Sequence, residues 1–548
     1  MATIRANMID YEAERQHFRW EAPDEFNFAV DVVGKWATDP QKEAMWWVGA
    51  DGQERHITFA EFARRSNQAA DAFSRLGIQK GDRVLVMLPR LVEWWEVVLG
   101  LMKLGAIPIP CTVLLTSKDI QFRAEAAKPT AIITDNDNAP KYDEVRERCP
   151  SIHSAIIVGS FRPRWTSYAE VVAEGSPAFR ALSTKSTDPC LIYFTSGTVG
   201  YPKMVLHTHA SYGIGHMITG KYWLDLHPDD LHWNVSEMGW AKAAWSNLFG
   251  PWSQGASMFI QDARGKFNPK ETLSFLAKYP ITTFCAPPTV YRLLVLEDLK
   301  AYPFKALRHC VGAGEPLNPE VIATWQETTG ITIRDGYGQT ETVLLCGNFP
   351  PLAVKPGSMG KPSPGFYLSV IDDVGNELPP NKEGDIAIKV KPERPLGLFQ
   401  EYWNNPDAMA RSFKGDWYIT GDRAYKDEDG YFWFVGRADD VIISAGYRIG
   451  PFEVESALVE HPAVAESAVV ASPDEMRGEI VKAFVILTPG YTASEELAEE
   501  LQEYVKKATA PYKYPREIEF VTELPKTISG KIRRVELRER ERARKASK

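Results

Sequence analysis

The chain has few cysteines, no long uninterrupted apolar run and no excess of positive charge. Its six cysteines among 548 residues are scattered without a Cys-x-x-Cys pair, so we expect neither a zinc site nor a disulfide framework. The most apolar stretch, residues 91–110, is broken by charged residues and prolines. It predicts a helix followed by a strand, with no transmembrane segment. The net charge of −9 argues against a nucleic-acid partner.

The first thirty residues lack the features of a targeting segment. They contain six acidic residues, too many for a transit peptide, and no apolar stretch of the kind found in secretory signals. We therefore predict a cytoplasmic protein with reduced thiols. The content of 44% hydrophobic and 25% charged residues is typical of globular proteins, and 548 residues are too many for one compact core, so several domains are expected.

The first part of the chain alternates helical and apolar extended patterns. A helix is expected to begin at Thr58 and to end at Gly77, and short strands are expected at 84–88, 106–109, 131–134 and 155–158. This alternation predicts an α/β domain with largely parallel sheets. Residues 212–252 are rich in Trp, Met, Gly and His without clear periodicity, which is typical of a core or of the wall of an apolar ligand pocket.

A loop rich in glycine and hydroxyl residues follows the apolar run 191–194. Residues 195–203 read Thr-Ser-Gly-Thr-Val-Gly-Tyr-Pro-Lys. Glycines let successive backbone N–H groups surround an anion, while hydroxyls and an ammonium add donors and charge. It is not the common Gly-Lys-Ser/Thr nucleotide loop, because Pro202 precedes the lysine and no hydroxyl follows it. We predict a phosphate-binding loop with these members: Thr195, Ser196, Gly197, Thr198, Gly200 and Lys203.

Five further polar segments follow in order. Residues 310–317 read Cys-Val-Gly-Ala-Gly-Glu-Pro-Leu, 334–342 read Arg-Asp-Gly-Tyr-Gly-Gln-Thr-Glu-Thr, 418–422 read Tyr-Ile-Thr-Gly-Asp, 436–440 read Gly-Arg-Ala-Asp-Asp, and 525–531 read Pro-Lys-Thr-Ile-Ser-Gly-Lys. Each alone would be an ordinary turn. Together with the loop they resemble, over almost the entire chain, the adenylate-forming superfamily of acyl-CoA synthetases, adenylation domains and luciferases. The resemblance is strongest to the medium-chain acyl-CoA synthetases.

The resemblance implies an α/β fold with a large multi-sheet N-terminal domain and a small mobile α+β C-terminal domain. The expected limits are 1–436 for the ATP- and acyl-binding domain, 437–440 for the hinge and 441–548 for the lid that carries the catalytic lysine. In the lid, a helix capped by Thr492 and Glu495 is expected. The basic residues after about Val535 are expected to form a solvated helix or a frayed tail.

Most site residues follow from the resemblance. Those expected at ATP or AMP, besides the loop, are Gly314, Glu315, Pro316, Asp335, Gly336, Tyr337, Gly338, Gln339, Thr340, Asp422, Arg437 and Lys531. Asp335 is expected to accept from the adenine amino group, Tyr337 to stack on the ring, and Asp422 to accept from both ribose hydroxyls. Thr340 is expected to contact phosphate, and Glu341 to hold Mg²⁺ as a hard oxygen ligand.

The implied reaction activates a carboxylate by attack on the α-phosphorus of ATP, with release of pyrophosphate. The expected catalytic residues are Lys531, Thr195 and Glu341, and Lys531 bridges the carboxylate and the phosphate. Rotation about Asp439 then withdraws Lys531 before the second half-reaction.

The segment after the hinge is expected to meet coenzyme A once that rotation has occurred. Its residues are Gly446, Tyr447 and Arg448. Gly446 lacks a Cβ and lets the pantetheine arm pass close to the backbone, and Arg448 is placed to meet a phosphate of coenzyme A.

The acyl pocket is expected to involve Trp240, Gly312 and Gly338. Synthetases specific for acetate carry tryptophan at the position of Gly338, so glycine there predicts a larger acid: medium-chain, branched or aromatic. The alternative is that glycine satisfies the loop geometry and that Trp233, Trp240 or Trp245 fills the space.

Three other functions are weighed against an acyl-CoA synthetase. The first is an amino- or aryl-acid adenylating enzyme that loads a carrier protein. The amino-acid enzymes need an acid for the substrate ammonium, and the chain offers only Glu237, in no clearly matching place. A nucleotide-binding protein without ligase activity would lack Lys531, Asp422 or Glu341, yet all three are present. A luciferase has no separate support. The expected partners are a small carboxylic acid, ATP with Mg²⁺, and coenzyme A; a homodimer is left open.

Overall fold

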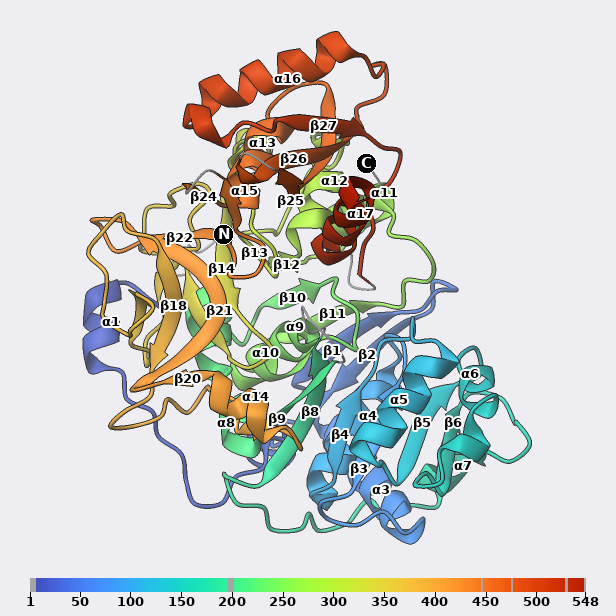
Figure 1. Ribbon diagram of the computed structural model, residues 1–548. Coiled ribbons are helices and arrows are strands. Elements are labelled where there is room, and N and C mark those ends of the chain that lie inside the picture. The colour runs from blue at the N-terminus through green and yellow to red at the C-terminus, as the bar shows by residue number, and fades with distance from the viewer. Residues whose placement is uncertain (1–5, 196–201, 445–446, 475–476, 528–530, 547–548) are drawn as a thin grey trace.

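The computed structural model describes residues 6–195, 202–444, 447–474, 477–527 and 531–546 (Figure 1). Most of the predicted phosphate loop (Ser196, Gly197, Thr198 and Gly200) and Gly446 of the predicted coenzyme A segment lie outside these residues.

The first sheet is the parallel α/β unit that the sequence predicts. Its order is β4-β3-β5-β6-β7, and all its pairs are parallel. The strands are β3 (Arg83–Met87), β4 (Ile107–Pro110), β5 (Ala131–Asp135), β6 (Ser154–Val158) and β7 (Thr166–Ser167). The helices of this region are α1 (Tyr11–His17), α2 (Val33–Trp36), α3 (Phe59–Arg75), α4 (Val92–Leu104), α5 (Ser117–Ala127), α6 (Ala139–Asp143) and α7 (Tyr168–Ala173).

A nine-stranded sheet forms the centre of the larger part of the chain. Its order is β16-β15-β14-β13-β12-β10-β11-β1-β2, parallel from β14 to β1 and antiparallel at both edges. The strands are β1 (Glu43–Val48), β2 (Glu54–Thr58), β10 (Leu231–Asn234), β11 (Ser257–Gln261), β12 (Thr283–Ala286), β13 (His309–Ala313), β14 (Ile333–Gly338), β15 (Leu344–Gly347) and β16 (Lys361–Pro362). The helices between them are α8 (His209–Gly213), α9 (Ala241–Ala244), α10 (Gly250–Ser253), α11 (Pro269–Lys278), α12 (Pro288–Leu294) and α13 (Pro319–Thr329).

Two smaller antiparallel sheets complete the larger part. The sheet β19-β9-β8 joins β8 (Pro189–Thr195), β9 (Lys203–Thr208) and β19 (Glu401–Tyr402). The other sheet contains β17 (Leu368–Ile371), β18 (Gly384–Lys389), β20 (Phe413–Lys414), β21 (Trp417–Lys426) and β22 (Phe432–Arg437), with α14 (Pro406–Arg411) before β20. The sheet β19-β9-β8 fixes the two ends of the phosphate loop, because Thr195 on β8 pairs with Lys203 on β9.

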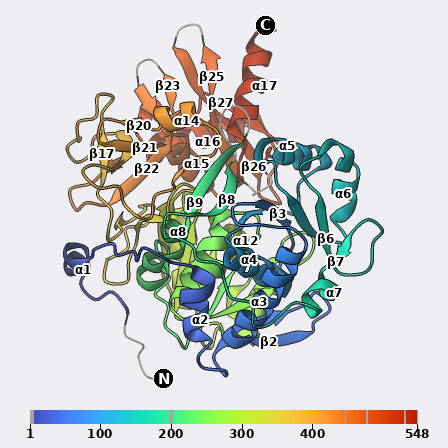
Figure 2. The ribbon, with the colours of Figure 1, turned by 90° about the horizontal axis from the view of Figure 1, so that it is seen from below.

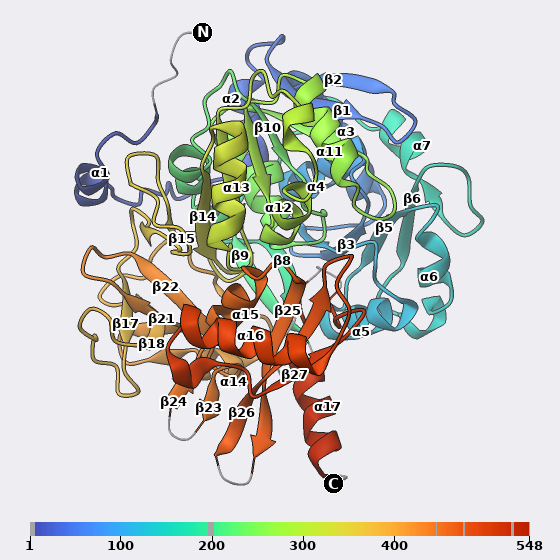
Figure 3. The same cartoon turned by 90° about the horizontal axis from the view of Figure 1, so that it is seen from above.

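The residues after the predicted hinge form a small α+β unit that lies against the larger part near α12 and α13 (Figures 1 and 3). We call it the C-terminal unit. It contains β23 (Ile442–Ser444), β24 (Tyr447–Ile449), β25 (Val464–Asp474), β26 (Gly478–Leu487), β27 (Glu517–Phe520), α15 (Pro451–Val459), α16 (Glu495–Ala508) and α17 (Arg534–Ala546). The five strands form one sheet.

One expectation for the C-terminal unit is wrong and another holds only in part. Helix α16 begins after Ser494, whose side chain accepts the N–H of Leu497, so Thr492 is not the cap. The residues after Val535 form a helix, which was one of the two expected alternatives, but the helix is not fully solvated, because Leu537 and Glu541 of α17 are buried. Helix α17 lies at the outer end of the unit and packs on β25 (Figure 2). The buried side chains of Leu537 and Glu541, the second paired with Lys482, hold α17 in place, although its charged composition is typical of a solvent-exposed helix.

The sequence of residues 212–252 shows no helical periodicity because the stretch is not a regular α-helix. It contains two π-helical turns, Thr219–Trp223 and Trp245–Phe249, in which the N–H groups of Leu224 and Gly250 bond back over five residues. Such turns break the regular spacing of an α-helix. Across the described ranges, no helix has the length and apolarity needed to cross a membrane.

Candidate active site

Lys203 and Glu341 meet at one aromatic ring. Lys203 Nζ lies 4.6 Å from the ring centroid of Tyr402, and Tyr402 OH donates to Glu341 Oε1 at 2.9 Å. Burial raises the pKa of Glu341, and the hydrogen bond from Tyr402 and the charge of Lys203 do not fully offset it. The predicted phosphate lysine and the predicted metal ligand are therefore held together, with a carboxylate that lacks full compensation for its charge.

Asp422 is held by two donors from the polar segment 334–342. Tyr337 OH and Gln339 Nε2 both donate to Asp422 Oδ2 at 2.6 Å. Arg437 Nε lies 3.6 Å from Oδ1. Gly421, with φ of +76°, turns the chain just before the aspartate, a conformation that favours glycine. Burial nevertheless raises the pKa of Asp422, although Arg437, Tyr337 and Gln339 lower it.

Arg437 lies between Asp422 and the predicted hinge. Its Nε is 3.8 Å from Asp439 Oδ1, and within the described residues this buried Nε has no hydrogen-bond partner. The guanidinium thus connects the predicted ribose-binding aspartate to the hinge aspartate by charge.

Asp335 is a buried carboxyl within β14. Its Oδ1 accepts the N–H of Gly336 at 2.9 Å. Burial raises the pKa of Asp335 to about 8, against smaller lowering effects of the Gly336 N–H and the charge of Lys242. The side chain is therefore mostly protonated at neutral pH before a ligand binds.

Two neighbouring side chains, Thr289 and Arg292, hold Glu315 by hydrogen bonds. Thr289 Oγ1 donates to its Oε1 at 2.8 Å, and Arg292 Nη2 donates to Oε2 at 2.9 Å. Burial raises the pKa of Glu315, but Arg292, Thr289 and the charge of Lys531 outweigh it, so the net shift is downward. Gly314 precedes it with φ of +106°, which gives this segment its sharp turn.

Lys531 comes from the other side of the hinge. Its backbone N–H donates to Thr527 Oγ1 at 3.0 Å, next to an antiparallel bridge between Lys526 and Ile532. Its charge contributes to lowering the pKa values of both Asp422 and Glu315. The ammonium therefore lies within electrostatic reach of two predicted nucleotide-binding residues.

Gly338 does not border an open space on the side of its missing Cβ. A Cβ there would lie 2.3 Å from Trp245 Cη2 and 2.6 Å from the carbonyl oxygen of Val343. The alternative that a tryptophan fills this space is therefore the one that the structure has, with Trp245. Of the other predicted acyl-pocket residues, Trp240 is half-buried before α9, and Gly312 lies on β13.

Of two further predicted residues, Thr340 contacts side chains of the larger part and Tyr447 contacts a ring of the C-terminal unit. The carbonyl of Thr340 accepts from His207 Nε2 at 2.8 Å and from Tyr212 OH at 2.7 Å. Tyr447 of the predicted coenzyme A segment is 53% exposed and stacks on Tyr512, with ring centroids 4.4 Å apart. It therefore presents an open aromatic surface on the C-terminal unit.

Two residues of this region were not predicted from the sequence, and a third was weighed only as an alternative. Tyr402 lies in a two-residue strand without a motif, and only its pairing with Val205 brings it to Lys203. Lys242 Nζ donates to the carbonyl of Ala313 at 2.6 Å, and burial lowers its pKa. The sequence did offer a signal for Lys242, because it is the one charged residue in the stretch 241–250. Trp245 was named only as an alternative.

Comparisons with known proteins agree with this arrangement. Residues 34–403 match the family described as "AMP-binding enzyme", and residues 453–531 match "AMP-binding enzyme C-terminal domain". The chain is 51% identical over 545 residues to "Acyl-coenzyme A synthetase ACSM3, mitochondrial" of Homo sapiens, covering 98% of this chain and 93% of that protein.

Two solved structures are also similar. One is the anthranilate CoA ligase AuaEII in complex with anthranoyl-AMP, with a TM-score of 0.88 and 31% identity over 96% of this chain and 99% of that one. The other is a benzoate CoA ligase from Burkholderia xenovorans LB400, with a TM-score of 0.83 and 30% identity over 94% of this chain and 100% of that one.

Proposed function

The chain belongs to the AMP-binding enzyme family, and on that premise we propose that it is an acyl-CoA synthetase that forms an acyl-AMP intermediate. A carboxylate oxygen attacks the α-phosphorus of ATP and pyrophosphate leaves; the thiol of coenzyme A then attacks the acyl carbon and AMP leaves. The observation that carries the proposal is the position of Lys531, which reaches from the C-terminal unit to within electrostatic range of Asp422 and Glu315.

The adenosine end of ATP is assigned to Asp422, Tyr337 and Asp335. The Asp422 carboxyl, already held by Tyr337 and Gln339, is pre-positioned to accept from ribose hydroxyls. Asp335, whose pKa is about 8, gains a reason to ionise when the adenine amino group donates to it.

The phosphate end is assigned to Thr195, Lys203 and Lys531. Lys203 and Thr195 occupy paired positions at the two ends of the loop, so both face the same phosphate chain. Lys531 stabilises the charge that develops between the attacking carboxylate and the α-phosphate. Donors held in place before the reaction contribute most, because they need no reorganisation when charge appears.

Glu341 fits the role of Mg²⁺ ligand. Its half-buried carboxylate accepts from Tyr402, whose ring contacts Lys203, and its raised pKa reflects a charge that the surrounding side chains do not fully balance. The described residues form no cluster of three metal-ligating side chains, which suits an ion that takes its other ligands from phosphate and water. A bound Mg²⁺ would neutralise charge on the departing pyrophosphate.

The second half-reaction is assigned to the same site after the C-terminal unit has turned about Asp439. Arg437 Nε lies 3.8 Å from Asp439 Oδ1, so this arginine contacts the residue about which the unit turns. The turn withdraws Lys531 and brings Gly446, Tyr447 and Arg448 to coenzyme A. The domain limits at 436 and 441 follow from this hinge.

The acid is proposed to be larger than acetate, in the medium-chain or aromatic range. Both similar solved structures are named as ligases of aromatic acids, and the relative is named an acyl-coenzyme A synthetase. Because Trp245 occupies the space beside Gly338, this tryptophan rather than the glycine is assigned as the wall that limits the acyl group. A carrier-loading function has less support, since Glu237 is engaged by the N–H groups of Gly239 and Val113.

The test is pyrophosphate release with Mg-ATP and a panel of acids from acetate through octanoate to benzoate, with and without coenzyme A. Sustained turnover that needs the thiol, with acetate poor, is the expected result. Turnover restricted to amino acids and indifferent to coenzyme A would replace this function by carrier loading. Cell fractionation and light scattering check the cytoplasmic location and the homodimer, which both stay predictions.

A further inference from the structure

Asn318 occupies the capping position of helix α13 but does not cap it. Asparagine there usually accepts an N–H of the first turn. Instead its side chain, in a residue only 6% exposed, accepts from Arg292 Nη1 at 3.3 Å and donates to Ser456 Oγ at 3.2 Å. The Asn318 side chain thus joins the larger part of the chain to the C-terminal unit instead of capping its own helix.

Arg292 connects this contact to the predicted nucleotide segment. Its Nη2 donates to Glu315 Oε2 and to Thr289 Oγ1, both at 2.9 Å, while Nη1 donates to Asn318. The guanidinium is planar, so its donors cannot move independently. The position of Glu315 and the position of the Asn318 amide are therefore coupled.

On the other side, Ser456 stands next to Glu455 on α15. Glu455 binds Arg534, with Nη2 to Oε2 at 2.7 Å, and Arg534 follows Lys531 by three residues. The charge of Glu315 also acts on Arg534. Helix α15 thus contacts the larger part through Ser456 and the segment that presents Lys531 through Glu455, and it lies beside α13 (Figures 1 and 3).

We propose that the Asn318–Ser456 contact positions the C-terminal unit for the first half-reaction and is broken for the second. Asn318, Arg292 and Ser456 are positioning residues, which act through the placement of Lys531. The two joined side chains lie on opposite sides of Asp439, so a turn about the hinge separates them. The inference rests on the proposed function, because it assigns Lys531 to adenylate formation.

A reversible cross-link tests the contact. The double variant Asn318→Cys with Ser456→Cys is oxidised, and the six native cysteines, all buried, give little background. The cross-linked enzyme is expected to form acyl-AMP in a single turnover, while acyl-CoA formation falls by about two orders of magnitude and returns on reduction. Each single-cysteine variant, treated with the same oxidant, is the control. Unchanged acyl-CoA formation in the cross-linked enzyme, or a folded double variant that does not cross-link, would overturn the proposal.

A milder variant separates positioning from general loss of structure. Ser456→Ala is expected to slow acid-dependent ATP–pyrophosphate exchange about three- to tenfold, the effect of one lost hydrogen bond. Thioester formation from synthetic acyl-AMP and coenzyme A stays unchanged, and Ser456→Thr restores the exchange. The matched control is Ser467→Ala, whose hydroxyl bonds to the Glu455 carbonyl inside the C-terminal unit.

The two half-reactions also separate the failure of this inference from the failure of the proposed function. Equal slowing of both half-reactions in Ser456→Ala, or no slowing of the exchange, would contradict the positioning role. A wild-type enzyme without exchange for any acid would instead contradict the proposed function.

Discussion

Two groups of buried carboxylates in this molecule have opposite electrostatics. In the candidate site, burial raises the pKa values of Asp335, Glu341 and Asp422 above their ordinary range. In the C-terminal unit, burial also opposes the charge of Glu541, but Arg544, Lys482 and Ser472 outweigh it and lower its pKa. One group is left short of positive charge, and the other is fully paired.

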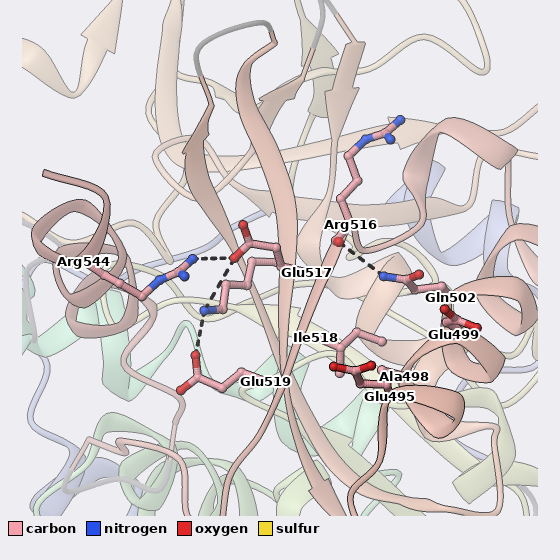
Figure 4. A pocket seen from close by; sticks show the side chains of 10 residues that line it. Glu495, Ala498, Glu499, Gln502, Arg516, Glu517, Ile518, Glu519 and Arg544 are labelled. Atoms are coloured by element: carbon pink, nitrogen blue, oxygen red, sulfur yellow. Dashed lines mark hydrogen bonds and ion pairs between the residues drawn. The ribbon is translucent and has the colours of Figure 1, made fainter. Parts of the chain in front are cut away.

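The paired group lies on the outer face of the C-terminal unit. Lys482 Nζ is 2.6 Å from both Glu541 Oε1 and Glu519 Oε2, and Arg544 pairs with Glu517 and Glu541. Figure 4 shows Glu517, Glu519 and Arg544 beside a cavity of about 460 Å³. The difference teaches that burial alone does not mark a functional carboxylate. A buried carboxylate that its own chain does not neutralise is the one prepared for a cationic or hydrogen-donating ligand.

The largest expected effect is on stability, from breaking the paired group. Lys482→Met leaves Glu541 buried without its lysine, which should lower the free energy of unfolding by about 3–5 kcal/mol. Denaturant unfolding measures this, and the kcat of the remaining folded enzyme should change little, because the ion pairs of Lys482 lie within the C-terminal unit. A loss of activity without a loss of stability would contradict the structural role of this group.

The next effect is on activity, from removing the positive charge that reaches the unpaired group. Lys531→Ala should slow adenylate formation by about 10²–10³-fold, the usual cost of one transition-state donor. The unfolding midpoint should not change, because the side chain is exposed. Lys526→Ala is the matched control, since this lysine of the same segment pairs with Glu466 at 2.8 Å. If both variants lost adenylation equally, the segment rather than the Lys531 charge would be responsible.

The two groups should also respond to pH in opposite ranges. The folded pKa of Asp335, about 8, lies above its unfolded value, so its contribution to stability is full at low pH and is lost as pH rises toward 8. Asp335→Asn should therefore gain stability over wild type between pH 5 and 8, by at most about 1.4 kcal/mol per pH unit. Unfolding midpoints at several pH values measure it.

Glu541→Gln supplies the opposite case. Because the folded pKa of Glu541 is lowered, its contribution is present above the unfolded pKa and is lost as pH falls through the folded one. The difference between wild type and Glu541→Gln should stay constant from pH 5 to 8 and shrink at lower pH. A difference for Asp335→Asn that also stayed constant from pH 5 to 8 would contradict the raised pKa of Asp335.

The smallest effect concerns the acyl group. Trp245→Leu frees space beside Gly338 and should raise the kcat/KM ratio of dodecanoate to hexanoate about tenfold, since each buried methylene contributes about 0.8 kcal/mol. Trp233→Leu is the control, because this tryptophan packs on Phe259 and Phe284 in the aromatic core. A ratio that changed equally in both variants would show that Trp245 does not limit the acyl group.

Much of the fold follows from the sequence, because it depends on local patterns. The first four strands of the parallel sheet, β3 to β6, lie close to their predicted positions, since short apolar runs between turns leave few alternatives, while the short β7 was not predicted. The family and the order of its motifs also follow. A helix was one of the two alternatives for the C-terminal run, but its burial did not follow, because a charged sequence gives no sign that Glu541 will be buried against Lys482.

The sequence predicts the motifs of the candidate site but not which side chains contact one another. Asp422 and Lys531 stand in recognisable segments, but Tyr402 reaches Glu341 only through sheet pairing between distant strands. Gly338 gave the wrong expectation of open space, because the filling ring comes from Trp245 on a π-helical turn 93 positions earlier in the chain. Contacts between segments far apart in sequence carry no local pattern.

The central claim is that Asp335, Glu341 and Asp422, whose pKa values are raised, serve a reaction in which an acid is joined to AMP. The most direct measurement uses octanoate with ¹⁸O in both carboxylate oxygens, together with Mg-ATP and coenzyme A, and mass analysis of the products. One labelled oxygen should appear in AMP and none in pyrophosphate, because the oxygen that attacks the α-phosphorus stays with AMP when the thiol takes the acyl group. Acyl-CoA formed with unlabelled AMP, or label found in inorganic phosphate, would contradict the acyl-AMP route.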